Sequence, residues 1–150
     1  MGKLKIYLDT SVFSAYYDVR VKLRQEQTKR FWVNLKEYDK YISEIVIDEL
    51  NSVSDDVLRK KLIGLTKDFE ITKVDADSEA LADQYIKKGI FPEKYRDDAL
   101  HLAVATVNGI DILISWNFEH LVKRKTRLDA NLTNSLNGYK SIEIIAPPEL

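Results

Sequence analysis

The stretch Lys3-Leu4-Lys5-Ile6-Tyr7-Leu8-Asp9-Thr10-Ser11 decides the fold of this chain. Its apolar residues alternate with the others, which is the period-two pattern of a β-strand, and the strand stops at Asp9. In an open parallel sheet, ligands bind outside the carboxyl ends of the strands, so Asp9 is a candidate active-site acid. An equally good interpretation is that Asp9 caps the helix expected to start near Thr10.

Composition limits the chemistry that the chain can perform. The 150 residues suit a single domain, residues 1–150, and carry a formal net charge of -1, which argues against a protein that coats nucleic acid with a strongly basic surface. Cys is absent and His occurs twice, so thiolate sites are excluded and a metal site must rely on oxygen ligands. Such ligands favour Mg²⁺ or Mn²⁺ over zinc.

The order of the predicted elements indicates an α/β fold. Strand patterns at the N-terminus, 41–42, 69–74, 111–115 and 142–145 alternate with helical patterns at 12–18, 22–40, 44–53, 57–67, 75–88, 94–108 and 120–137, and Pro147-Pro148 should terminate the structure. We therefore expect a three-layer α/β/α sandwich with a mainly parallel central sheet. No run approaches membrane-spanning length and no signal-peptide core is visible, so we expect a cytoplasmic protein without membrane contact.

Two more acids lie on the apolar faces of their helices. Glu49 shares a face with Ile45 and Val46, where an unpaired charge costs several kcal/mol, roughly, unless a cation or hydrogen bonds compensate. A salt bridge, or a side chain that reaches solvent, is the alternative interpretation. Asp98 lies on the side of its helix that carries small residues, whereas its neighbour Asp97 is expected to be solvated.

Three further residues bear on the same site or lie beside it. Asn117 follows the strand at 111–115 and offers a neutral oxygen, although Asn is also common in such turns. His101 stacks with Asp97, and we expect it at the surface or partly buried, not as a metal ligand. Trp116 is expected to pack, with base stacking as the alternative.

These motifs together resemble the PIN-domain family, in particular small VapC-type ribonuclease toxins. The resemblance rests on four blocks in order along nearly the whole chain: Leu8-Asp9-Thr10-Ser11-Val12-Phe13, Glu49-Leu50, Arg96-Asp97-Asp98-Ala99-Leu100-His101-Leu102-Ala103, and Leu113-Ile114-Ser115-Trp116-Asn117-Phe118-Glu119-His120-Leu121. It implies a metal-dependent endoribonuclease in which Asp9, Glu49 and Asp98 are the catalytic and metal-binding acids. Asn117 departs from the family pattern, which often has Asp there.

The resemblance also implies supporting residues and partners. Ser11 and Ser115 match polar positions beside the site, and an antitoxin protein and a homodimer are implied as partners. A basic segment follows the fourth block and comprises Lys123, Arg124, Lys125 and Arg127. We expect it either to contact RNA phosphates or to be a solvated helix face.

Two other functions remain open at this stage. The first is a PIN-like domain that has lost turnover and binds RNA or protein, an interpretation that Asn117 keeps alive. The second is phosphoryl transfer with Asp9 as the nucleophile. Asp9-Thr10-Ser11 lacks the second Asp of the haloacid-dehalogenase-like pattern, and the chain has no Gly-rich phosphate loop, so this interpretation ranks last.

Overall fold

The computed structural model describes residues 2–150 and contains a five-stranded sheet in the order β3-β2-β1-β4-β5. Every neighbouring pair of strands is parallel, so the expectation of a mainly parallel sheet is confirmed. The strands are β1 (Lys5–Leu8), β2 (Asp39–Ser43), β3 (Glu70–Thr72), β4 (Ile112–Ile114) and β5 (Glu143–Ile145). Because β1 is the middle strand, the residue that follows it lies at the centre of the row formed by the carboxyl ends of the strands.

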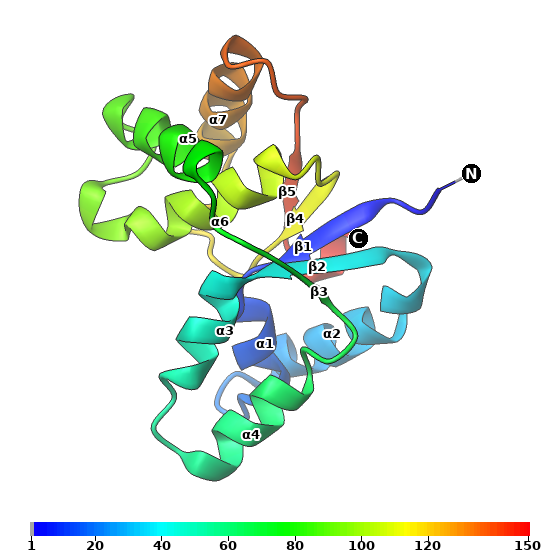
Figure 1. Ribbon diagram of the computed structural model, residues 1–150. Coiled ribbons are helices and arrows are strands. Elements are labelled where there is room, and N and C mark those ends of the chain that lie inside the picture. The colour runs from blue at the N-terminus through cyan, green and yellow to red at the C-terminus, as the bar shows by residue number, and fades with distance from the viewer. Residues whose placement is uncertain (1) are drawn as a thin grey trace.

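Helices cover both faces of the sheet, as the three-layer prediction requires. Figure 1 shows one group of helices below the sheet and another above it. The first group is α1 (Thr10–Tyr17), α2 (Lys22–Val33), α3 (Glu44–Asn51) and α4 (Asp56–Gly64). The second is α5 (Ala76–Lys87), α6 (Arg96–Val107) and α7 (Arg124–Leu136). Short 3₁₀ turns occupy Leu35–Glu37 (η1), Glu93–Tyr95 (η2) and Pro147–Glu149 (η3).

Strand β1 is buried on both faces, which corrects the simple alternation expected from its sequence. Tyr7, expected on the polar face, is fully buried together with Ile6 and Leu8, whereas Leu4 lies before the strand and is 52% exposed. A central strand of a parallel sheet has helices on each side, so both of its faces are in the core. The tyrosine hydroxyl therefore needs an internal hydrogen-bond partner.

Three predicted boundaries are wrong, two because of contacts with distant parts of the chain and one because of a local turn. The helix expected at 22–40 ends at Val33, since residues 39–41 pair with β1. The helix expected from residue 120 starts at Arg124, since the backbone N–H groups of Leu121 and Val122 bond to the carbonyl oxygen of Asn117. Pro147 does not end the structure: η3 packs against α2.

Helix α6 carries small buried residues and packs closely against α5. Ala99, Ala103 and Ala105 are all fully buried, and the helix ends before Gly109, whose φ of 68° requires a residue without a side chain. Its first turn holds Asp98 half-buried and Asp97 exposed, as their positions on the helix predict. The helix therefore directs one acid inward and the other outward.

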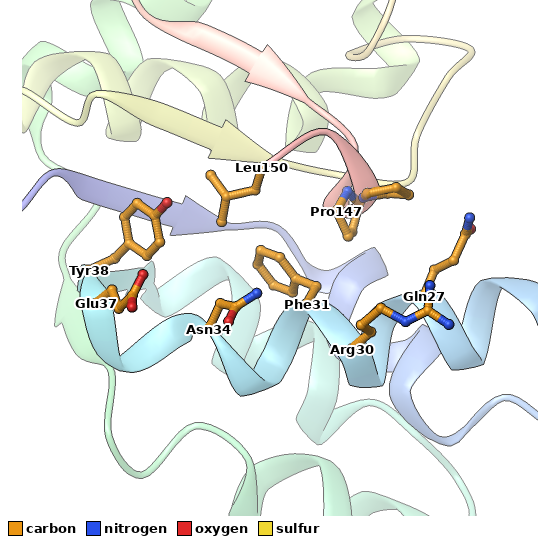
Figure 2. Close-up of a pocket in the computed structure, with 9 residues that line it drawn as sticks. Gln27, Arg30, Phe31, Asn34, Glu37, Tyr38, Pro147 and Leu150 are labelled. Carbon is orange, nitrogen blue, oxygen red and sulfur yellow. The ribbon is translucent and has the colours of Figure 1, made fainter.

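The C-terminal turn and α2 enclose a surface cavity of about 350 Å³ (Figure 2). Phe31 and Pro147 line it, along with Tyr38 and Leu150, and none of the predicted acids does. The cavity is thus separate from the acids at the strand ends. Within residues 2–150, every helix is too short or too polar to traverse a lipid bilayer.

Candidate active site

Asp9 lies at the carboxyl end of β1 and performs both of the roles considered for it. It is the N-cap of α1, with Oδ1 accepting hydrogen bonds from the Ser11 backbone N–H at 3.1 Å and the Ser11 hydroxyl at 2.5 Å. Its other oxygen, Oδ2, accepts from the Ser115 hydroxyl at 2.6 Å, just beyond β4. Only 4% of Asp9 is exposed. The two serines thus hold both of its oxygens. Asp9 is both the N-cap of α1 and an acid near Glu49.

Burial raises the pKa of Asp9, because a charged carboxylate is disfavoured away from water. The charge of His101 and the hydrogen bonds from Ser11 and Ser115 oppose that rise, whereas the charge of Glu49 adds to it. Burial therefore outweighs the two serines and His101 at this carboxylate, and a bound cation would favour its charged form.

Glu49 is held by hydrogen bonds between α3, α6 and α1. Its Oε1 accepts from the Thr10 hydroxyl at 2.8 Å and contacts Nε2 of His101 at 2.7 Å. Burial alone would raise the pKa of Glu49, but the hydrogen bond and charge of His101, with help from Thr10, lower it. The apolar-face carboxylate therefore has a partner, and that partner is a histidine.

His101 contradicts the sequence-based expectation of a surface or partly buried residue, since it is only 2% exposed. Its Nδ1 lies 2.7 Å from Oη of Tyr7, so both ring nitrogens are engaged. Burial would lower its pKa, but the hydrogen bond to Glu49 and the charges of Asp9, Glu49 and Asp98 outweigh burial and raise it. The prediction failed because it grouped His101 with Asp97 and overlooked that Asp98 lies only three residues before it.

Asp98 faces Asn117 across the gap between α6 and the end of β4. The Asn117 side-chain amide donates to Asp98 Oδ2 at 3.3 Å, while Asn117 Oδ1 accepts from the backbone N–H of His120 at 2.9 Å. Burial is the main cause that raises the pKa of Asp98, and Asp9 adds to it, whereas His101 and His120 oppose it. Asn117 thus uses its oxygen to shape the loop and presents N–H groups to the acid.

The basic segment divides into two parts. Lys123, Arg124 and Lys125 are exposed at the start of α7, and Lys125 forms an ion pair with Asp129 at 2.6 Å. Arg127 is half-buried, and its Nε is buried without a hydrogen-bond partner among the described residues. The exposed part of the segment is therefore Lys123, Arg124 and Lys125, of which Lys125 has an ion-pair partner among the described residues.

Trp116 packs in the interior, as expected. Its ring is 8% exposed and its Nε1 donates to the Thr28 hydroxyl at 2.9 Å. The guanidinium of Arg24 lies 5.2 Å from the centre of the ring. The side chain is not presented as a free stacking surface, so the alternative of base stacking by Trp116 has no support in this arrangement.

The donor set suits a hard divalent cation by its chemistry. Asp9, Glu49 and Asp98 come from three separate parts of the chain and influence one another electrostatically. Among the ion pairs of residues 2–150, none joins a Lys or Arg to any of these three acids. Mg²⁺ and Mn²⁺ prefer oxygen ligands such as carboxylates. A carboxylate that is not paired with Lys or Arg is free to bind one of these cations.

The side chains are not preassembled around a metal position. Within residues 2–150, no three acidic or histidine side chains already form a group that could hold a metal ion. Asp9 is bonded to its serines and Glu49 to His101 and Thr10. Asp98 is held less firmly, by one hydrogen bond from Asn117 at 3.3 Å, so it is the acid with the most freedom to move toward a cation.

Solved structures with this fold come from bacterial toxin–antitoxin proteins. The chain is similar to VapC20 of Mycobacterium tuberculosis, described as a sarcin-ricin loop cleaving toxin, with a TM-score of 0.62 and 20% identity over 93% of this chain and 99% of that one. VapBC2 of Rickettsia felis, solved bound to a promoter DNA fragment, gives a TM-score of 0.59 and 15% identity over 95% and 98%. VapBC-1 of nontypeable Haemophilus influenzae gives 0.59 and 14% over 96% and 98%.

At these identities the solved structures establish the fold alone. No curated protein sequence matches the chain. The family model for the PIN domain, in contrast, matches residues 6–121, which include Asp9, Glu49, Asp98 and Asn117. The chain therefore belongs to the PIN-domain family.

Proposed function

We propose that this protein is a metal-dependent endoribonuclease and the toxin of a toxin–antitoxin pair. The observation that supports the proposal is electrostatic: the charge of Glu49 raises the pKa of Asp9, that of Asp9 raises the pKa of Asp98, and no Lys or Arg of residues 2–150 forms an ion pair with these acids. Such an arrangement is unfavourable for stability, and it is retained where a divalent cation binds. Membership of the PIN-domain family supports the same conclusion.

The residues divide the work according to their environments. Asp9 and Asp98 are the proposed ligands of Mg²⁺ or Mn²⁺, with Ser11 and Ser115 orienting Asp9. Glu49 completes the ligand set or accepts a hydrogen bond from the attacking water. When bound, the cation supplies a water of lowered pKa and stabilises the charge that builds on the phosphate.

RNA is the proposed substrate, and the exposed end of α7 is its proposed phosphate contact. Lys123, Arg124 and Lys125 lie soon after Asn117 in the chain and are exposed. Contacts of this kind weaken as salt rises. Binding releases counterions from the phosphates, and that release is less favourable when the solution already contains more salt. Arg127 was also expected to bind RNA, and its half-buried position makes it the weakest member of the set.

The proposed partners follow from the solved structures with this fold, several of which are toxin–antitoxin complexes. We propose that an antitoxin protein binds this chain and blocks cleavage, that the chain forms a homodimer, and that it acts in the cytoplasm.

The test is cleavage of RNA by the purified protein with added Mn²⁺ or Mg²⁺. Asp9→Asn keeps an oxygen for the helix cap but removes the charge, so we expect cleavage to fall at least about 100-fold, equal to roughly 3 kcal/mol of transition-state stabilisation. Asp97→Asn is the control, since Asp97 is exposed on the outer side of α6. If Asp9→Asn cleaves as fast as the wild type, the site is wrong.

A catalytically silent PIN domain that binds RNA or protein is the second candidate, favoured by the Asn117 contact with Asp98. An amide that donates to a proposed ligand competes with a cation for it. RNA binding without cleavage by the wild type at saturating Mn²⁺ would support this candidate. Asn117→Asp should then strengthen Mn²⁺ binding, which calorimetry measures.

A further inference from the structure

A continuous chain of buried hydrogen bonds leads from the start of α3 to the Glu49 carboxylate. Ser43 caps α3 by accepting the backbone N–H of Ile45 at 3.2 Å, and its hydroxyl lies 2.7 Å from Oη of Tyr7. Tyr7 Oη is 2.7 Å from Nδ1 of His101, whose Nε2 is 2.7 Å from Glu49 Oε1. Tyr7 and Ser43 are fully buried and His101 nearly so.

The donors and acceptors of this chain fit one direction. With the proton of a neutral imidazole on Nε2, His101 donates to Glu49 and its Nδ1 accepts from the Tyr7 hydroxyl. Tyr7 Oη then accepts from the Ser43 hydroxyl, whose oxygen already accepts from the Ile45 N–H. Every buried hydrogen in the series has an acceptor. An additional proton on Nδ1 would leave Nε2 as the donor to Glu49, so the direction of that bond does not depend on the charge of the ring.

The contact also restricts the Glu49 carboxylate to one orientation. Both of its hydrogen bonds, from His101 and Thr10, fall on Oε1. Oε2 accepts no hydrogen bond from the described residues, so it is available to a cation or a water. Glu49 is half-buried at the edge of α3, and without these two bonds its side chain could rotate into solvent.

We propose that His101, held by Tyr7 and Ser43, is a positioning residue that fixes the Glu49 carboxylate with Oε1 bound and Oε2 presented to the reaction. This inference deepens the proposed function and rests on it for the role of Glu49. Helix α6 would then contribute two residues to the site: Asp98 itself and His101, which orients Glu49 on α3. Groups that orient metal-site ligands typically change affinity or activity by roughly 10- to 100-fold when removed.

The hydrogen bond itself is tested without any activity, by NMR of the metal-free protein labelled with ¹⁵N-histidine. The chain has only two histidines, so His101→Gln assigns their ring signals. We expect a proton on Nε2 of His101 that exchanges slowly with water, and faster exchange in Glu49→Ala. Absence of the Nε2 proton in the wild type, or unchanged exchange in Glu49→Ala, overturns the proposal whether or not the protein cleaves RNA.

The positioning role is tested with two substitutions of similar size. His101→Leu keeps the packing but loses the donor, and we expect kcat to fall about tenfold or more with KM for RNA within about twofold. His101→Gln places an amide N–H near the position of Nε2 and should restore most of kcat. Equal losses in both variants at equal melting temperatures would mean that His101 only fills space, and would overturn the proposal.

Two milder variants guard against misfolding of the buried substitutions. Thr10→Val removes the outer hydrogen bond to the same Glu49 oxygen, and Tyr7→Phe removes the support of the ring. If both fold and neither lowers kcat, the orientation of Glu49 does not matter and the proposal fails. If the wild type binds Mn²⁺ but does not cleave, the proposed function fails, and Mn²⁺ affinity decides the inference: His101→Leu should weaken binding and His101→Gln restore it.

Discussion

Tyr7 and Tyr85 are both fully buried and both hydrogen-bonded, yet they belong to clusters of different character. Tyr85 donates to Asn134 Oδ1 at 2.5 Å and lies 3.4 Å from the Thr106 hydroxyl, so its cluster is neutral and joins α5, α6 and α7. The cluster of Tyr7 passes through His101 to the charged Glu49, which is half-buried. A neutral cluster that ends within the core can only support packing, whereas one that ends at a partly exposed carboxylate can influence chemistry.

The sharpest test of this contrast replaces the two adjacent acids of α6. Asp98→Asn removes a proposed metal ligand, so we expect cleavage to fall about 100-fold. It also removes a carboxylate whose pKa is raised by burial, so the melting temperature of the metal-free protein should rise by roughly 2–4 °C. Asp97→Asn should change neither, since Asp97 is exposed. Cleavage assays and thermal melts measure both effects. A lower melting temperature for Asp98→Asn would show that the charge of Asp98 is compensated without metal.

The second test removes one hydroxyl from each cluster. Tyr7→Phe and Tyr85→Phe each leave buried partners without a hydrogen bond, at a cost of about 1–3 kcal/mol in the free energy of unfolding. Only Tyr7→Phe should also lower kcat, by about threefold to tenfold, because it loosens His101. Denaturant melts and steady-state kinetics compare the two variants. Equal kinetic effects would show that the clusters do not differ in function.

The third test uses pH. The pKa of His101 is raised in the folded protein, so its stabilising contribution is complete below about pH 6.5 and is lost as the pH rises through the folded value. Asp9 and Asp98, whose pKa values are also raised, act in the same direction, and the lowered pKa of Glu49 matters only in more acidic solution.

We therefore expect the melting temperature of the metal-free protein to fall by roughly 2–5 °C between pH 6 and pH 8. His101→Gln should flatten this dependence, and Tyr85→Phe should leave it unchanged because its cluster carries no charge. A melting temperature that rises over this range would contradict the assignment of a charged network to the Tyr7 side.

The smallest expected effect concerns the exposed basic residues beyond both clusters. Lys123→Ala should raise KM for RNA by about twofold to fivefold, leave kcat unchanged and reduce the salt dependence of binding by about one unit of slope. Lys60→Ala on α4 is the matched control, since Lys60 is also exposed but lies on the other face of the sheet. Equal effects of the two variants would remove α7 from the RNA-binding surface.

The acids could be predicted from the sequence because each stands in a pattern of its own helix or strand. Asp9 follows an apolar strand, and the helical period separates Glu49 from Asp48 and Asp98 from Asp97; the structure finds Asp48 and Asp97 exposed. The parallel sheet explains the contact between Asp9, which follows β1, and Ser115, which follows the neighbouring β4. Patterns within single elements were sufficient to predict which of these acids are exposed; their role in catalysis stays a prediction.

The groups that hold Glu49 could not be found in this way, because their roles depend on other elements. Tyr7 resembles a polar-face residue until both faces of β1 are seen to be covered, and His101 contacts a glutamate 52 residues away. The end of α2 was likewise misplaced, since it is set by the pairing of β2 with β1. The end of α2 and the contact of His101 depend on residues far away in the sequence, so patterns in the local sequence do not predict them.

The central position of β1 also determines when the site can exist during synthesis. The backbone N–H of Asp9 bonds to the carbonyl oxygen of Ile114, and the Asp9 side chain bonds to Ser115, 106 residues later in the chain. At about 5–20 residues per second, the ribosome needs roughly 5–20 s to make the intervening segment. A nascent chain therefore carries Asp9 long before it carries Ser115, and the candidate site becomes complete only when most of the polypeptide has been translated.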